Sequence, residues 1–447
     1  MKVSELVGST LLDAIRKIAG KPEACAKRPG KDFTRTRKIG LDKLLTLLVC
    51  WGQETMTGEL GDMAGWDGET PTASALTQQW AKLNDAAMPA LLDEFLLRFK
   101  IEPYLGKYRL YAADGTELQL LPGTGGDACR VRNGHGEGRH SELHITCAYD
   151  LVRHTFEDAL CQGGAQENEQ AALCAIVDRA KPGGNLRPLW LADRNFCTWN
   201  VIFHMIDAGA AFCLRDKDAN FEHLLGDAMA EGEFDTQIER CVMRTRSRSA
   251  KTRPDEANLY RYLQNIQPFD ALELGSREEW WCRLRLVRIA LPAGSDGDPN
   301  QGDRWLNLVT NLDASEFSPS ELAALYSMRW AEEIGFLHLK NTVGMRDPRT
   351  HDLKRAEQEL WGRLILYDAC SLGVSGVPEP QEGPKHARAA NRTDAFKAFM
   401  RMLRSKVRRT AYDVEAFAAR MSHSVRPKRG HKRRSRPKSP PKSCYRH

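Results

Sequence analysis

The stretch that decides both fold and chemistry reads Leu325-Tyr-Ser-Met-Arg-Trp-Ala-Glu-Glu-Ile-Gly-Phe-Leu-His-Leu-Lys340. It belongs to residues 320–344, where apolar side chains recur at helical spacing after a Ser-Pro-Ser-Glu start signal at 318–321. Arg329 precedes Glu333 by one helical turn, and Tyr326 and Lys340 lie two turns to either side of Glu333. The spacing predicts one helix with these polar side chains on one face. A solvated helix face joined by an Arg–Glu ion pair would give the same pattern.

Two aspartates follow apolar runs earlier in the chain. Asp114 comes after residues 108–113 and Asp193 after residues 188–192, so each is expected at or near the end of a strand. Together with Glu333 they can converge on divalent cations, because Mg²⁺ prefers oxygen ligands and phosphodiester cleavage commonly uses two ions. A single acid is weak support in a chain of 447 residues that holds 59 of them. The three segments carry weight because they occur together and in order.

At these residues the chain resembles the DDE transposases of bacterial insertion sequences, of the insertion-sequence-four type. The signature of that family is Y-(2)-R-(3)-E-(6)-K, and its spacing is met by Tyr326, Arg329, Glu333 and Lys340. The segments 112–116 and 191–196 resemble those around the two aspartates of the family, and the resemblance runs from about residue 32 to 372. Glu332 departs from the pattern, since the family commonly has an apolar residue there. Spacing nominates Glu333 rather than Glu332 as the ligand.

The resemblance implies a metal-dependent enzyme that cleaves DNA strands at the ends of a mobile element and transfers them to target DNA. Asp114, Asp193 and Glu333 would be both catalytic residues and ligands of two Mg²⁺ ions, for which Mn²⁺ can substitute. The partners implied are double-stranded DNA, as terminal inverted repeats and target, and a second transposase subunit in the DNA complex. The residues assigned to DNA phosphates are Tyr326, Arg329, Lys340 and, more weakly, Arg194.

The implied fold is α/β, with a ribonuclease H-like core interrupted by a β-rich insertion. The chain then divides into a helical end-binding region (1–105), the first part of the core (106–216), the insertion (217–312), the second part of the core with the catalytic helix (313–372), a helical region (373–425) and a basic tail (426–447). The hydrophobicity pattern supports this order. Strands are expected at 108–121, 144–150, 155–160, 188–192, 211–215, 237–245, 280–291 and 304–310, and helices at 167–180, 198–209, 357–369, 394–406 and 414–421.

Charge is distributed unevenly along the chain. The net charge is +6, yet residues 426–447 hold ten Lys or Arg and no acid, which leaves the remainder slightly acidic. This composition predicts a disordered arm that binds polyanions, although a solvated tail without a role fits as well. The basic segments 26–38 and 244–253 are weaker candidates for DNA contacts. Some relatives hold a flipped base with a tryptophan, for which Trp280, Trp281 and Trp305 are candidates unless they belong to the core.

Cysteine spacing and the N-terminal residues indicate the cellular compartment and the kinds of site to expect. Twelve cysteines without CxxC spacing support neither a zinc ribbon nor a disulfide framework. The first residues lack the apolar core of a signal peptide, so we expect a cytoplasmic protein that joins the nucleoid when it binds DNA. Two other functions stay open: a related metal-dependent nuclease that cuts without joining, and an inactive repressor that only binds DNA.

Overall fold

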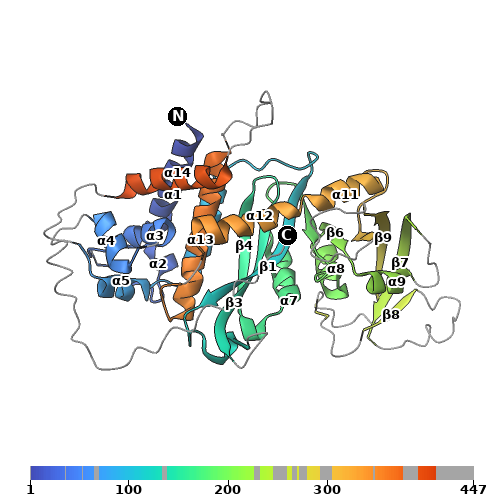
Figure 1. The fold of residues 1–447 in the computed structure, drawn as a ribbon, viewed down its shortest axis with the longest axis horizontal. Helices are drawn as coiled ribbons and strands as arrows, with labels where there is room; N and C mark the ends of the chain where they lie inside the picture. Colours follow the sequence, from blue (N-terminus) through green and yellow to red (C-terminus); the bar gives the residue numbers. More distant parts are fainter. Residues whose placement is uncertain are drawn as a thin grey trace.

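A computed structural model describes residues 2–35, 37–52, 54–64, 70–132, 138–225, 232–244, 259–263, 269–270, 279–291, 305–345, 348–375 and 391–408. Its architecture is mixed α/β, with helices packed on both faces of one large sheet (Figure 1). The predicted helix at 414–421 and the basic tail at 426–447 lie outside the described residues, as does most of the basic segment 244–253.

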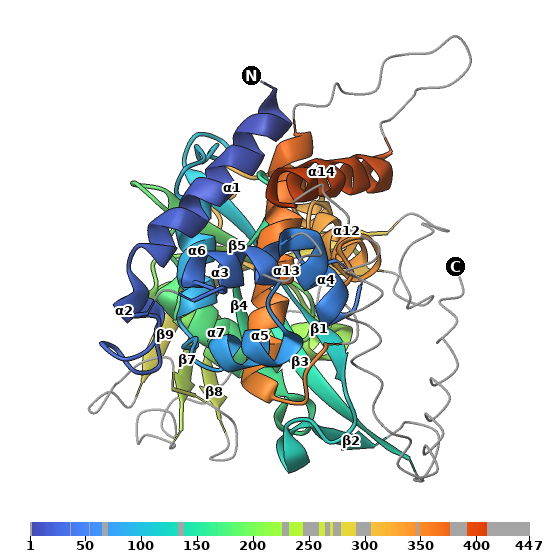
Figure 2. The ribbon, with the colours of Figure 1, turned by 90° about the vertical axis from the view of Figure 1, so that its left-hand side faces the viewer.

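The N-terminal region is helical, as predicted. Its helices are α1 (Val3–Ala19), α2 (Pro22–Cys25), α3 (Leu41–Cys50), α4 (Met56–Ala64), α5 (Ala73–Trp80) and α6 (Ala87–Leu96). Helices α1, α3 and α6 pack against the long α13 (Leu353–Val374), which joins this region to the sheet (Figure 2). The buried Trp80 of α5 donates from Nε1 to Oε1 of Gln358 on α13 at 2.7 Å. The N-terminal helices therefore share a core with the rest of the molecule.

The first half of the sheet has the predicted order of elements. Strand β1 (Tyr108–Leu120) pairs antiparallel with β3 (Arg139–Asp150) and parallel with β5 (Arg187–Ala192), and β5 pairs parallel with β6 (Ala211–Arg215). Strand β4 (Thr155–Gly163) forms a hairpin with β3. The short β2 (Arg130–Arg132) continues the edge beyond β3.

Strands from the predicted β-rich insertion continue this same sheet. Strand β10 (Trp305–Thr310) pairs antiparallel with β6, followed by β9 (Trp280–Ala290), β7 (Phe234–Met243) and β8 (Tyr260–Tyr262). Residues 217–312 thus contribute these four strands to the sheet. A short helix, α9 (Asp218–Leu225), connects β6 to it.

The two faces of β1 are covered by different helices. Ala113 packs in the core beneath α7 (Glu169–Arg179) and α8 (Trp199–Asp207), whereas Ala112 packs in the core that includes α13 and the N-terminal helices. Because side chains alternate along a strand, Asp114 faces the side of Ala112 and Gly115 faces the side of Ala113. The chain ends its described part with α14 (Arg392–Val407), which packs on α13.

The predicted single helix over 320–344 is wrong in one respect, because the segment is divided. Helix α11 (Pro319–Ser327) begins with a capping box between Ser318 and Glu321, as its start signal indicated. Met328 and Arg329 form a turn before α12 (Trp330–His338), and a π-helical turn, η4 (Leu339–Val343), follows directly. The four signature residues therefore lie on consecutive helical segments rather than on one regular helix, although Met328 and Arg329 keep right-handed helical backbone angles.

Candidate active site

The two aspartates lie at the ends of neighbouring parallel strands. The last registered pair of β1 and β5 is Ala113 opposite Ala192, so Asp114 and Asp193 follow side by side. Adjacent strands lie about 4.8 Å apart, which brings the two carboxylates into one neighbourhood. Each is held by a nearby backbone amide at 2.8 Å, Asp114 by Gly115 and Asp193 by Asn195.

Glu333 reaches the same place from α12 through Arg329. The Arg329 guanidinium donates to Glu333 Oε1 at 2.7 Å and to Asp114 Oδ2 at 3.5 Å. The break before α12 places Arg329 at the N-cap of that helix, where its side chain can lie between both acids. The structure thus connects the strand and helix carboxylates through one cation.

Burial and the neighbouring charges together determine how readily the Asp114 carboxyl group ionises. Burial raises its pKa to about 6, helped by the charges of Asp193 and Glu333, while Arg329 and the Gly115 amide act in the opposite direction. Its side chain keeps 26% exposure, so the carboxylate still opens toward solvent. Asp193 and Glu333 are near enough for their charges to disfavour ionisation of Asp114. All three predicted ligands are therefore brought together.

Glu332 has a different environment from its neighbour Glu333. Its side chain is fully buried, and burial, followed by the charge of Asp114, raises its pKa well above the usual range. The backbone amide of Asp114 acts weakly against this rise, but neither carboxyl oxygen has a hydrogen bond of good geometry among the described residues. Burial disfavours ionisation of the Glu332 carboxyl group, whereas Glu333 is partly exposed and paired with Arg329, so the surroundings of Glu333 suit a metal ligand better.

The residues predicted to contact DNA have mixed environments. Tyr326 is buried on α11 with its ring 5.9 Å from the Arg329 guanidinium, and its hydroxyl has no hydrogen-bond partner in the described chain. Lys340 lies in the π-helical turn and Arg194 directly after Asp193, both partly exposed. Among the tryptophans, Trp281 is 47% exposed, whereas Trp280 and Trp305 are partly buried.

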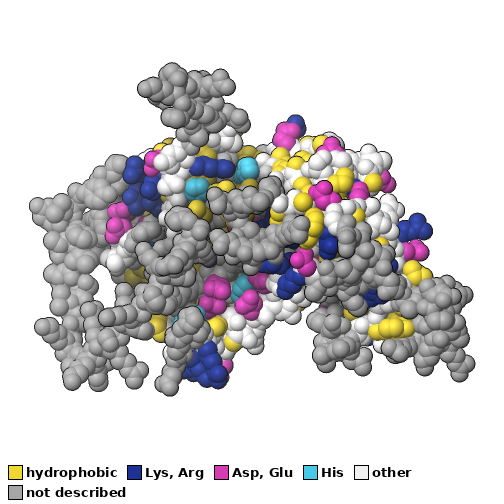
Figure 3. All heavy atoms as spheres, turned by 45° about the vertical axis from the view of Figure 1, so that its right-hand side comes forward, with side chains coloured by type: hydrophobic (Ala, Val, Ile, Leu, Met, Phe, Trp, Pro, Cys, Tyr) yellow, Lys and Arg dark blue, Asp and Glu magenta, His cyan; other side chains and the backbone are white. Residues whose placement is uncertain are grey.

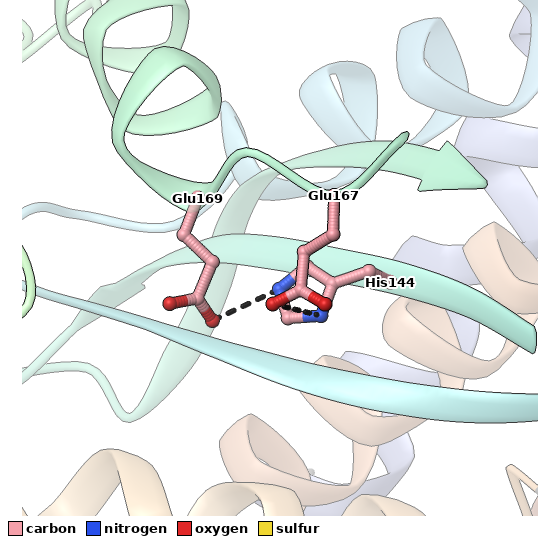
Figure 4. A group of neighbouring side chains, drawn as sticks. All are labelled: His144, Glu167 and Glu169. Carbon is pink, nitrogen blue, oxygen red and sulfur yellow. Dashed lines mark ion pairs between the residues drawn. The ribbon is translucent and has the colours of Figure 1, made fainter. Parts of the chain in front are cut away.

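The opposite face of β1 carries a second polar group that the sequence patterns did not reveal. His144 of β3 is buried, with Nε2 2.9 Å from Glu169 Oε1 and Nδ1 3.5 Å from Glu167 Oε1 (Figure 4). Glu169 opens α7, and its other oxygen accepts from Asn195 Nδ2 at 2.5 Å. Only the acids at the start of α7 could have suggested this group, because His144 lies in an ordinary alternating strand. The contact between Glu169 and Asn195 in the Asp193 loop depends on tertiary structure.

The two groups differ in their suitability for a cation. At Asp114 three carboxylates face one Arg, and the pKa of Asp114 is raised mainly by burial, with smaller contributions from the charges of Asp193 and Glu333. At His144 the pKa of the imidazole is raised by Glu169 and Glu167 against desolvation, and the pKa of Glu169 is lowered by His144. These two acids approach opposite ring nitrogens (Figure 4), and one ligand atom from each of the three residues lies within 4.8 Å of the others, so this group is a second, smaller candidate for a cation. The oxygen donors at Asp114, Asp193 and Glu333 fit hard divalent cations.

Comparison with known proteins identifies a family for the part of the chain that holds this site. A family described as "Transposase DDE domain" matches residues 105–368, which cover β1 through most of α13. The transposase InsG for insertion sequence element IS4 of Escherichia coli (strain K12) is 35% identical over 81 residues, 17% of this chain and 18% of the relative. The piggyBac transposase in a synaptic complex with hairpin DNA aligns with 96% of this chain and 86% of its own at 9% identity and a TM-score of 0.45. The family match extends over more than half of the chain, and this protein belongs to the transposase DDE domain family.

Proposed function

We propose that this protein is a transposase that cleaves DNA strands at the ends of an insertion sequence and joins them to target DNA. The observation that carries the proposal is the convergence of Asp114, Asp193 and Glu333, with Arg329 between the first and the last. Family membership and the partial identity to an insertion-sequence transposase support it. The strand order β4-β3-β1-β5-β6, with its antiparallel and parallel halves, supports a ribonuclease H-like core.

Asp114, Asp193 and Glu333 would hold two Mg²⁺ ions, or Mn²⁺ in their place. When bound, such ions activate a water or a DNA 3′-hydroxyl and stabilise the oxyanion that leaves the phosphodiester. The backbone amides of Gly115 and Asn195 orient the two aspartates before any ion arrives. The positive charge of Arg329 limits the repulsion among the carboxylates, which otherwise would oppose their approach.

The same residues would position the DNA. Arg329 is a permanent cation beside the carboxylates, so a phosphate entering the site gains an ion pair there. Lys340 and Arg194 would add phosphate contacts on either side. The hydroxyl of Tyr326, which has no partner among the described residues, would donate to a phosphate oxygen when the site closes on DNA. The required partners are double-stranded terminal repeats, target DNA and a second subunit, and the reaction would take place in the cytoplasm.

Surface charge agrees with contacts distributed along DNA. Figure 3 shows Lys and Arg side chains at several separate places on the face it presents, interspersed with acids. Cations at separate places can each pair with a different phosphate of a long duplex.

None of the described helices is long and apolar enough to cross a membrane.

The decisive experiment incubates the purified protein with its own flanking DNA, a target plasmid and Mg²⁺. Cleaved ends together with joined products are expected from the wild type, and neither from the Asp193→Ala variant. Cleaved ends without joined products would instead establish the nuclease. Binding to flanking DNA without cleavage, under conditions in which a paired substrate is supplied, would establish the repressor.

A further inference from the structure

We infer that Glu169, with His144 behind it, is a positioning residue that fixes the Asp193 loop and so sets the affinity of the active site for divalent cations. This inference rests on the proposed function of Asp193 as a metal ligand. It assigns a role to the polar group on the face of β1 opposite the carboxylate cluster.

The physical connection runs through Asn195. Glu169 Oε2 accepts from Asn195 Nδ2 at 2.5 Å, and the backbone amide of Asn195 donates to Asp193 Oδ1 at 2.8 Å. Gln170, the next residue of α7, donates to the Asn195 carbonyl at 2.7 Å. Asn195 is itself exposed, whereas the next residue, Phe196, is buried in the core and its amide donates to the Asp193 carbonyl at 3.1 Å, so α7 adds a second anchor on the solvent side of the loop. The first turn of α7 thus clamps the side chain and the carbonyl of the residue whose amide orients Asp193.

His144 determines where Glu169 lies. Its ring is buried on β3 and keeps Glu169 Oε1 within 2.9 Å, while Glu169 Oε2 remains turned toward Asn195. Strand β3 is paired with β1 along most of its length, so the ring has a fixed position relative to Asp114. These side chains therefore connect the Asp193 loop to β3, and the pairing of β3 with β1 fixes the position of Asp193 relative to Asp114.

Gly115 shows how closely this group approaches the site. A β-carbon at Gly115 would overlap Glu169 Oε1 and lie 2.6 Å from His144 Nε2. Only glycine leaves room for the carboxylate directly beside the residue that follows Asp114. The absence of a side chain at 115 is thus explained by the position of Glu169, and the same glycine donates its amide to Asp114.

Groups that orient metal-ligating carboxylates commonly change metal affinity by about 10–100-fold when removed. The test measures Mn²⁺ affinity of the DNA-free protein by electron paramagnetic resonance, with melting temperature measured on the same samples. Glu169→Ala and Asn195→Ala are each expected to weaken Mn²⁺ binding about tenfold. The double variant should be little worse than either single one, because both changes remove the same connection.

Glu167→Ala is the matched control, because Glu167 also faces His144 but has no contact with Asn195 among the described residues. It should leave Mn²⁺ affinity unchanged. Glu169→Gln keeps an acceptor for Asn195 and should recover most of the affinity that Glu169→Ala removes. A purely structural role would lower the melting temperature of Glu169→Ala without changing Mn²⁺ affinity, and that result, or additive effects in the double variant, would overturn the inference.

The outcome is separable from failure of the proposed function. If the wild type and Asp193→Ala bind Mn²⁺ equally, the assignment of Asp193 as a ligand fails, whatever Glu169 does. If Asp193→Ala loses the ion while Glu169→Ala and Asn195→Ala retain wild-type affinity, only the positioning role is refuted. Should Glu169→Ala not fold, Asn195→Ala on the exposed loop carries the test by itself.

Discussion

The two faces of β1 carry polar groups whose carboxylates are offset by cations to different extents. On one face Asp114 shares its surroundings with Asp193, Glu333 and a single Arg329, and its pKa is raised to about 6. On the other face His144 lies between two glutamates, and the pKa of Glu169 is lowered. The first group sets three carboxylates against one guanidinium, whereas the second sets two carboxylates against one imidazole. The larger excess of carboxylates makes the first group the better candidate for divalent cations.

The largest expected effect tests the Asp114 group. Asp114→Ala, Asp193→Ala or Glu333→Gln should each reduce strand cleavage by at least about a thousandfold, since a two-ion site has no substitute for a missing ligand. DNA binding should stay within a few-fold of wild type by gel shift. Cleavage retained in any of these variants would remove that residue from the site.

The second prediction concerns the stability of the metal-free protein. Because the pKa of Asp114 in the folded state is raised from 3.8 to about 6, its contribution to stability is present below pH 4 and is lost as pH rises through 6. Asp114→Asn removes this loss. The variant should gain about 1–3 kcal/mol relative to wild type between pH 4 and 7.

Chemical denaturation in EDTA at several pH values provides the measurement for Asp114→Asn. A stability difference that does not change with pH would show that Asp114 is already neutralised by Arg329. In that case the carboxylates on the two faces of β1 would be offset by their cations to a similar extent.

The third prediction concerns the His144 group on the other face of β1. The pKa of His144 is raised, so its ion pairs stabilise the fold below the ordinary histidine value and are lost as pH rises through the raised one. The lowered pKa of Glu169 sets the acid limit of the same window. His144→Gln should therefore cost about 1 kcal/mol near pH 5.5 and less near pH 9, as measured by chemical denaturation. Equal costs at both values would mean that His144 is a neutral packing residue.

The fourth prediction concerns the basic tail, which we expect to contribute DNA affinity independently of the groups on either face of β1. Ten cations in residues 426–447 can release counterions from phosphate. Truncation after Val425 should therefore flatten the dependence of log K on log salt, by up to ~0.9 for each phosphate that the tail neutralises. Cleavage by complexes assembled at low salt should change little. An unchanged salt slope would show that the tail does not bind DNA.

The smallest effect is expected at Glu332. Burial raises the pKa of its carboxyl group well above the usual range and so favours the neutral form, which Gln matches closely in shape. Cleavage by Glu332→Gln should stay within about threefold of wild type. If Glu332→Gln were inactive and Glu333→Gln active, the ligand would have been assigned to the wrong neighbour.

Most elements around the site were predictable because their signals are local. The strand ending near Asp193, the capping box at Ser318 and the helical N-terminal region follow from apolar spacing and start signals that require no partner. The division of α11 from α12 was not predictable, since apolar periodicity continues across Met328 and Arg329. Only packing against the sheet shows that Arg329 lies at a helix start and points to two acids.

The sequence by itself determined which residues the proposed chemistry uses: three carboxylates in order, with Tyr, Arg and Lys at fixed offsets from the last. Tertiary structure alone decided that Asp114 and Asp193 lie side by side, because strand register depends on hydrogen bonds between residues far apart in the chain. It also decided that Glu332 is buried beside the partly exposed Glu333, and that His144 is connected to the Asp193 loop through Glu169. Burial and the charges of distant residues set these properties, and no local pattern encodes either.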